Sequence, residues 1–176
     1  MQNRNISQVT KTKDEFKLSI IIPCYNEEEV LPLTLEKLIT LFNEWSSRDD
    51  CESIEILFVD DGSHDHTAEL LAEATHAYQQ FKVVHFSRNF GHQAALLAGY
   101  EFAIGDVIVS LDADLQDPPE LIITMLEKLK EGYDIIYAAR KSRGIDSQFK
   151  RRTADLFYWL MKKLGAEIIH NHADFR

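Results

Sequence analysis

Two aspartates separated by one residue, Asp112 and Asp114, follow a short run of β-branched residues at positions 107–109. Such a run is typical of a buried parallel strand, and the prolines at 118 and 119 favour a helix start soon after it. Both carboxylates are therefore expected at the C-terminal end of a buried strand, the edge where open α/β sheets bind ligands. Paired carboxylates repel each other there unless a cation or a polar ligand compensates them, and their oxygens suit Mg²⁺ or Mn²⁺ already held by a diphosphate. Taken alone, the pattern also fits a turn whose aspartates only cap the next helix.

Two more apolar runs end in polar residues. Residues 54–59 lead into Asp-Asp-Gly-Ser at 60–63, and residues 18–22 lead into Pro-Cys-Tyr-Asn-Glu at 23–27. Because the carboxyl ends of parallel strands share one edge of a sheet, we expect three strands to deliver polar and acidic groups to one place. On its own, the Asp-Gly pair also fits an ordinary tight turn.

The three motifs together resemble the family 2 inverting glycosyltransferases of the GT-A fold. Within that family the sequence is most similar to the polyprenyl-phosphate sugar transferases, which include dolichol-phosphate mannose synthases and bacterial undecaprenyl-phosphate glucosyl- and aminoarabinosyltransferases. The resemblance runs from about Leu18 to Arg176. It implies an α/β GT-A fold: a doubly wound, mostly parallel sheet with helices on both faces. It also implies a metal-dependent, inverting transfer of a sugar from a nucleoside diphosphate sugar to an undecaprenyl or dolichyl phosphate. The Asp-Leu-Gln-Asp-Pro-Pro-Glu form at 114–120 favours a UDP-sugar, with GDP-mannose as the alternative donor.

The same resemblance assigns roles to individual residues. The predicted catalytic residues are Asp112, Asp114, Arg140 and Arg151. Arg151, or Arg152 in its place, is predicted from its position in the basic segment 140–163 and not from the resemblance. Those implied to bind the nucleotide sugar are Pro23, Tyr25, Glu27, Val59, Asp61, Asp112, Ala113, Asp114 and Arg140. The metal, Mg²⁺ or Mn²⁺, is assigned to Asp114 and Gln116. His64-Asp65-His66 stands where the family usually has a Pro-Asp-Gly or Thr-Asp-Gly turn, and it lacks a nearby third ligand for zinc.

Apolar and polar segments alternate along the chain, which predicts mostly parallel β–α units. The expected strands are 18–23, 54–60, 83–87, 107–109 and 134–139. The expected helices begin near 28 and 67, follow Gly91 to about 103, and span about 120–131 and 148–164. Asn26 is a candidate cap for the first of these helices. The last helix is amphipathic and basic at its ends. This pattern fits either a helix that lies against a membrane or lipid acceptor, or a helix that packs on the core with its basic residues in solvent.

Charge is unevenly distributed over the 176 residues, whose net charge is −10. This balance argues against general nucleic-acid binding. Residues 140–163 nevertheless hold 8 Lys or Arg against 2 Asp or Glu, so this segment is a candidate for contact with phosphate or an anionic membrane. Alternatively, these basic residues form only the solvent-exposed face of a helix.

The expected organisation is a flexible N-terminal arm at 1–16 and a GT-A catalytic domain at 17–176 that is truncated at its C-terminus. No apolar run approaches the roughly 18 residues of a membrane span, so a soluble fragment of a protein at the cytoplasmic side of the membrane is expected. Homo-oligomer formation is a further hypothesis. The alternatives are a non-catalytic nucleotide-sugar-binding fragment and a transferase with a glycan acceptor. An aspartate-dependent phosphatase would need Thr or Val where Gln116 stands.

Overall fold

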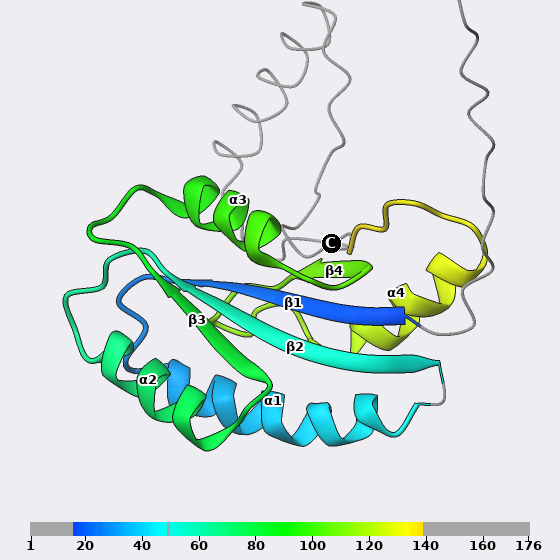
Figure 1. The fold of residues 1–176 in the computed structure, drawn as a ribbon, viewed down its shortest axis with the longest axis horizontal. Helices are drawn as coiled ribbons and strands as arrows, with labels where there is room; N and C mark the ends of the chain where they lie inside the picture. Colours follow the sequence, from blue (N-terminus) through cyan, green and yellow to red (C-terminus); the bar gives the residue numbers. More distant parts are fainter. Residues whose placement is uncertain (1–15, 49, 139–176) are drawn as a thin grey trace, which may run out of the picture.

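The computed structural model describes residues 16–48 and 50–138, which form a four-stranded parallel sheet with helices on both faces (Figure 1). The strands are β1 (Phe16–Cys24), β2 (Cys51–Asp60), β3 (Phe81–His85) and β4 (Val107–Ser110). The helices are α1 (Leu31–Ser46), α2 (Thr67–Ala77), α3 (His92–Phe102) and α4 (Leu121–Lys130). The strand order is β3-β2-β1-β4, so β1 lies inside the sheet and the chain winds outward from it in both directions.

Nearly continuous apolar sequence explains why β1 and β2 form the centre of the sheet. Both carry helices on their two faces, and residues 18 to 24 of β1 are all buried. Their pairing is in register from Leu18 opposite Ile54 to Cys24 opposite Asp60. The two strands therefore end side by side, and their following loops start at neighbouring points.

The two faces of the sheet have separate cores. The larger core holds side chains of α1, α2 and α4, including the buried Leu38, Leu71 and Leu126. The smaller core lies under α3 and contains Ile21 with Ala95. Figure 1 shows α1 and α2 on one side of the sheet and α3 on the other. This arrangement confirms the expected doubly wound parallel sheet.

The expected strand at 134–139 is not observed, because residues 134–138 have no strand conformation. A cavity of about 400 Å³ separates this segment from β4, and its walls include Val107 and Val109 on one side and Ile135 and Tyr137 on the other. Within the described residues β4 pairs only with β1, and residues 134–138 add no further strand beside it.

The start of α1 also differs from expectation. The helix begins at Leu31, and no side chain caps its N-terminus, so Asn26 is not its cap. A turn intervenes, in which the backbone N–H groups of Val30 and Leu31 donate to the Glu27 carbonyl. Phe16, the last residue of the expected arm, is already in β1. None of the described helices is long and apolar enough to cross a membrane.

Candidate active site

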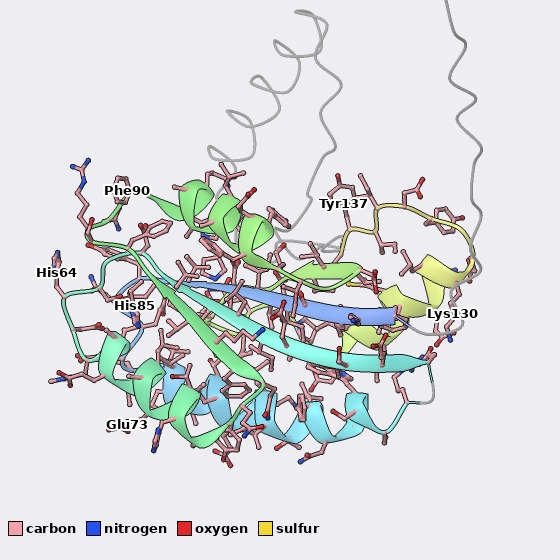
Figure 2. The ribbon with its side chains drawn as sticks, viewed as in Figure 1. His64, Glu73, His85, Phe90, Lys130 and Tyr137 are labelled. Carbon is pink, nitrogen blue, oxygen red and sulfur yellow. The ribbon has the colours of Figure 1, made fainter. Side chains whose placement is uncertain are left out.

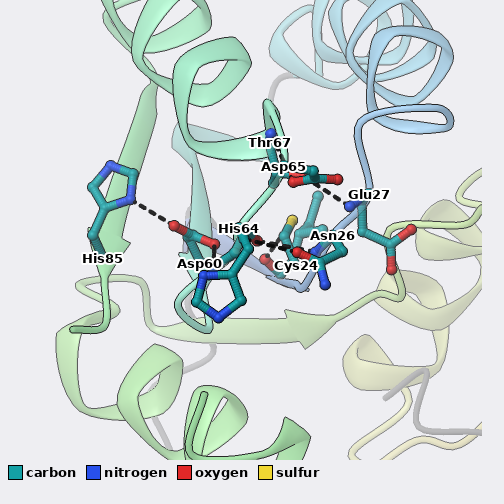
Figure 3. Close-up of polar contacts among 10 residues, drawn as sticks. Cys24, Asn26, Glu27, Asp60, His64, Asp65, Thr67 and His85 are labelled. Atoms are coloured by element: carbon teal, nitrogen blue, oxygen red, sulfur yellow. Dashed lines mark hydrogen bonds and ion pairs between the residues drawn. The ribbon is translucent and has the colours of Figure 1, made fainter. Parts of the chain in front are cut away.

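The loop after β1 is fastened to the loop after β2 by hydrogen bonds that run in both directions (Figure 3). Asn26 N donates to Ser63 Oγ at 3.0 Å, and His64 N donates back to Asn26 Oδ1 at 2.9 Å. Asn26 has a φ of 55°, a left-handed conformation that asparagine tolerates better than most residues. The side chain of Asn26 therefore serves loop geometry and joins the two strand ends.

A second set of bonds holds the backbone next to Glu27. Glu27 N donates to Thr67 Oγ1 at 2.7 Å, and Glu28 N donates to Asp65 Oδ2 at 3.1 Å. Asp65 also accepts the Thr67 N–H at 3.0 Å, so it binds the first residue of α2 as well as the first loop. Because these contacts involve the backbone of Glu27 and Glu28, the Glu27 carboxylate is left to point toward the end of β4 (Figure 3).

Asp60 and Asp61 are adjacent and equally buried, but they have different partners. Asp60 accepts the Ser63 N–H at 3.0 Å and pairs with His85 Nδ1 at 3.0 Å, which ties the end of β2 to the end of β3. Asp61 accepts the backbone N–H groups of Phe90 at 2.7 Å and Gly91 at 2.8 Å. In Figure 2, His64, His85 and Phe90 gather at one end of the molecule, whereas Lys130 and Tyr137 lie at the other.

The turn that contains Gly62 lies directly against the loop between β3 and α3. Gly62 has a φ of +69°, and a Cβ at this position would lie 2.3 Å from the carbonyl carbon of Arg88. Only glycine fits both the conformation and the contact. The loop thus approaches the end of β2 closely, and the Asp61 carboxylate holds it there.

The segment after β4 carries Asp112 and Asp114. Leu111 N donates to the Ile21 carbonyl at 2.9 Å, which extends the alignment of β4 with β1 beyond the strand. Thr34 Oγ1 of α1 donates to the Ala113 carbonyl at 2.6 Å. Asp114 Oδ1 accepts the Gln116 N–H at 3.0 Å across Leu115, whose φ is 53°. The pair of aspartates is therefore held on a tight turn.

These strand ends surround a cavity of about 420 Å³. Seven residues expected from the sequence line it: Pro23, Tyr25, Glu27, Asp61, Asp112, Ala113 and Asp114. Val59 is fully buried in the core under α3, and neither it nor Gln116 lines the cavity. Arg140 and Arg151 lie outside the described residues, so their roles stay predictions.

Four residues on the cavity wall were missed by the sequence analysis: Cys24, Asn89, His92 and Ala95. Asn89 and His92 belong to the loop after β3 and the first turn of α3. Asn89 could have been predicted from the sequence, because it follows a third strand, β3, that ends at the same edge of the sheet as β1 and β2. Cys24 is buried, and burial raises the pKa of its thiol, which keeps it protonated and unreactive.

Negative charge is concentrated on one wall of this cavity. The pKa of Glu27 is raised by partial burial and, beyond that, by the nearby carboxylates of Asp114, Asp65 and Asp112. A cation between these groups would relieve the repulsion. No group of three or more His, Cys, Asp or Glu among residues 16–48 and 50–138 is arranged to hold a metal alone. This donor set fits a cation that has one or two carboxylate ligands and takes the rest from a bound phosphate.

The chain is similar to known glycosyltransferases. The chain is 45% identical over 159 residues to the uncharacterized glycosyltransferase YkcC of Bacillus subtilis (strain 168), covering 90% of this chain and 48% of YkcC. It is 38% identical to a prophage bactoprenol glucosyl transferase homolog of Escherichia coli (strain K12), covering 91% of this chain and 51% of that protein. The chain thus spans about half the length of these curated relatives.

Solved structures share the fold at low identity. The mannosyl-3-phosphoglycerate synthase of Rubrobacter xylanophilus superposes with a TM-score of 0.60 at 20% identity, over 82% of this chain and 47% of that one. The mannosyltransferase PcManGT of Pyrobaculum calidifontis, in complex with GDP-Man and Mn²⁺, gives 0.54 at 24% identity, over 72% and 36%. The GT-A arrangement expected from the sequence is confirmed by these likenesses. Residues 19–174 match glycosyl transferase family 2, and the chain belongs to that family.

Proposed function

We propose that the protein binds a nucleoside diphosphate sugar in the cavity at the strand ends and transfers the sugar to a polyprenyl phosphate. The observation that carries this proposal is the acidic wall formed by Glu27, Asp112 and Asp114 at the carboxyl edge of a parallel sheet. A diphosphate needs a cation to enter such a site, and the acidic wall supplies one side of its coordination. The relatives that are named bactoprenol glucosyl transferases support the lipid phosphate as acceptor.

Different strand ends are proposed to bind different parts of the donor. Pro23, Tyr25 and Asp61 are assigned to the nucleoside, and Asp112 with Ala113 to the ribose and sugar. Val59, expected in the same group from the sequence, is buried in the core and does not line the cavity, so it is not assigned a contact with the donor. Asp61 keeps acceptor capacity beyond the two backbone N–H groups that it binds, since each carboxylate oxygen has two lone pairs. A UDP-sugar is favoured, with GDP-mannose as the alternative.

The metal would be held by Asp114, with Asp112 beside it and Gln116 as a predicted further ligand. Mg²⁺ or Mn²⁺ would neutralise the charge that develops on the departing diphosphate. Arg140, at the end of the segment after α4, is assigned to the same phosphates, for which a planar guanidinium is well suited.

Transfer needs no strong base, because a phosphate monoester is already ionised at pH 7, its second pKa being about 6. One acceptor oxygen attacks the anomeric carbon, the bond from that carbon to the diphosphate oxygen breaks, and the nucleoside diphosphate leaves with the electron pair. The configuration inverts. Two anions must approach each other, so cations are required, and Arg151 in the basic segment 140–163 is assigned to the acceptor phosphate.

A polyprenyl phosphate resides in a bilayer, so we place the full-length protein at the cytoplasmic side of a membrane. The basic segment would then face anionic lipid. Nucleic acid is not a proposed partner, and self-association remains a hypothesis. A glycan acceptor and a non-catalytic sugar-nucleotide-binding role are the competing assignments, and an assay with lipid phosphate separates them.

The decisive experiment measures donor binding and transfer in the full-length protein. Calorimetry with UDP-glucose and GDP-mannose in Mn²⁺ should show binding that Asp114→Asn weakens at least about tenfold, or 1.4 kcal/mol. Asp134→Asn, an exposed carboxylate away from this cavity, is the matched control. Transfer of labelled sugar to undecaprenyl phosphate in detergent should follow. Equal donor affinity in EDTA and in Mn²⁺ would refute the metal's role, and binding without transfer would favour the non-catalytic alternative.

A further inference from the structure

The side chain of Thr34 forms a hydrogen bond that leaves its own helix. Thr34 is fully buried in the first turns of α1, and its hydroxyl lies 2.6 Å from the Ala113 carbonyl oxygen and 3.3 Å from the Val30 carbonyl oxygen. A threonine inside a helix commonly donates to the carbonyl four residues earlier, here that of Val30. A hydroxyl has one hydrogen to donate, and the shorter contact is with Ala113. The donor is thus directed at a residue 79 positions away in the sequence.

Ala113 stands between the two aspartates of the acidic wall. Its carbonyl belongs to the peptide group that joins it to Asp114, so the orientation of that group determines where the Asp114 side chain leaves the backbone. Leu111 is held through Ile21 on the upstream side, and Leu115 adopts a left-handed conformation on the downstream side. The bond from Thr34 ties the intervening residues to a rigid helix.

Glu27, in the loop before α1, is bonded to the same end of this helix. The Glu27 carbonyl accepts the N–H groups of Val30 at 3.1 Å and Leu31 at 2.8 Å, which joins the first loop to α1. Glu27 lies on the cavity wall with Asp112 and Asp114. The start of α1 therefore contacts both strand-end segments that form the acidic wall.

We infer that Thr34 is a positioning residue for the metal site: its hydroxyl orients the Ala113 peptide and so aims Asp114 at the cation. This inference rests on the proposed function, because it concerns the metal that the nucleotide sugar would bring. Thr34 does not line the cavity and acts only through the backbone that it holds. Partners that orient metal ligands in this way typically change metal affinity by about 10- to 100-fold when they are lost.

The test compares three substitutions at Thr34. Thr34→Val keeps the branched shape and removes the hydroxyl, Thr34→Ala removes hydroxyl and methyl, and Thr34→Ser keeps the hydroxyl alone. Thr40→Val is the matched control, since the hydroxyl of Thr40 is exposed on the same helix and bonds to the Glu36 carbonyl within it. Electron paramagnetic resonance titration with Mn²⁺ in saturating UDP measures metal affinity without turnover. Calorimetry with UDP in EDTA measures nucleotide affinity without metal.

We expect Thr34→Val and Thr34→Ala to weaken Mn²⁺ binding by about tenfold or more, with UDP affinity in EDTA changed by less than about threefold. Thr34→Ser and Thr40→Val should retain Mn²⁺ affinity within about threefold. If Thr34→Val proves unfolded by near-ultraviolet circular dichroism, the Ser and Ala pair decides. Equal Mn²⁺ affinity in Thr34→Ser and Thr34→Ala would overturn the inference, as would a parallel loss of UDP binding in EDTA. Wild-type protein that binds no Mn²⁺ with UDP would instead overturn the proposed function.

Discussion

Substitution of Gly62 by alanine should damage the fold and the site together. Gly62 combines a φ of +69° with a contact in which an added Cβ would lie 2.3, 2.6 and 2.8 Å from the carbonyl carbon, Cα and oxygen of Arg88. All three are backbone atoms, so no side-chain rotation can make room. The loop between β3 and α3 has to move away from β2.

The cost has two parts. A left-handed conformation costs an L-residue with a Cβ about 1–2 kcal/mol. Displacement of the loop also weakens the bonds from Phe90 and Gly91 to the buried Asp61 carboxylate, and loss of one hydrogen bond to a charged group costs about 1.5–3 kcal/mol. The expected decrease in the free energy of unfolding is therefore about 2.5–5 kcal/mol.

Gly132→Ala is the matched control, because Gly132 has a φ of +96° but nothing within 4 Å of the added Cβ. It should lose only the conformational part, about 1–2 kcal/mol. Urea unfolding of the 176-residue chain, followed by tryptophan fluorescence, reports both values, since Trp45 is fully buried. Gly62→Ala should also weaken UDP binding, because the displaced loop contains Asn89, which lines the cavity. Equal destabilisation by the two substitutions would refute the assigned clash.

Two ionisable groups give further predictions of opposite sign. Because the pKa of Glu27 is raised, its contribution to stability is present below its unfolded pKa and is lost as the pH rises through its folded pKa. Glu27→Gln should therefore raise the melting temperature in EDTA more at pH 8 than at pH 4. An equal increase at both pH values would contradict this prediction. The pKa of Asp50 is lowered, first by hydrogen bonds from Arg48 and then by Lys130, so its contribution is present above its unfolded pKa and is lost as the pH falls. Asp50→Asn should lower stability by about 1 kcal/mol at pH 7 and by progressively less below pH 4, as measured by urea unfolding.

The strand ends could be predicted from the sequence because short apolar runs followed by polar residues identify both the strand and its edge. Asp61, Asp112 and Asp114 were placed correctly at one cavity by that logic alone. The segment 134–139 has the same apolar character, yet residues 134–138 form no strand, because pairing depends on a neighbour at the right distance and not on local sequence.

Contacts between loops could not be predicted from the sequence. Asn26 fits a helix cap by its position, but its side chain bonds to His64, 38 residues away. From the sequence, Thr34 could equally be a small residue on the core-facing side of its helix. Only the fold shows that its hydroxyl donates to the Ala113 carbonyl. Such bonds depend on the register of β1 against β2 and β4, which is a property of the whole sheet.

Two carboxylates at this edge, Asp65 and Glu27, have pKa shifts of opposite sign. The pKa of Asp65 is lowered even though burial acts to raise it, because Thr67 and the Glu28 N–H donate to it. Its charge is therefore compensated within the protein and contributes to the fold. Glu27 has the opposite balance, since burial and the carboxylates of Asp114 and Asp112 all oppose its ionisation. Its ionisation therefore costs free energy in the folded protein. In the proposed function, Glu27 is therefore one of the groups whose charge a cation brought with the donor would compensate.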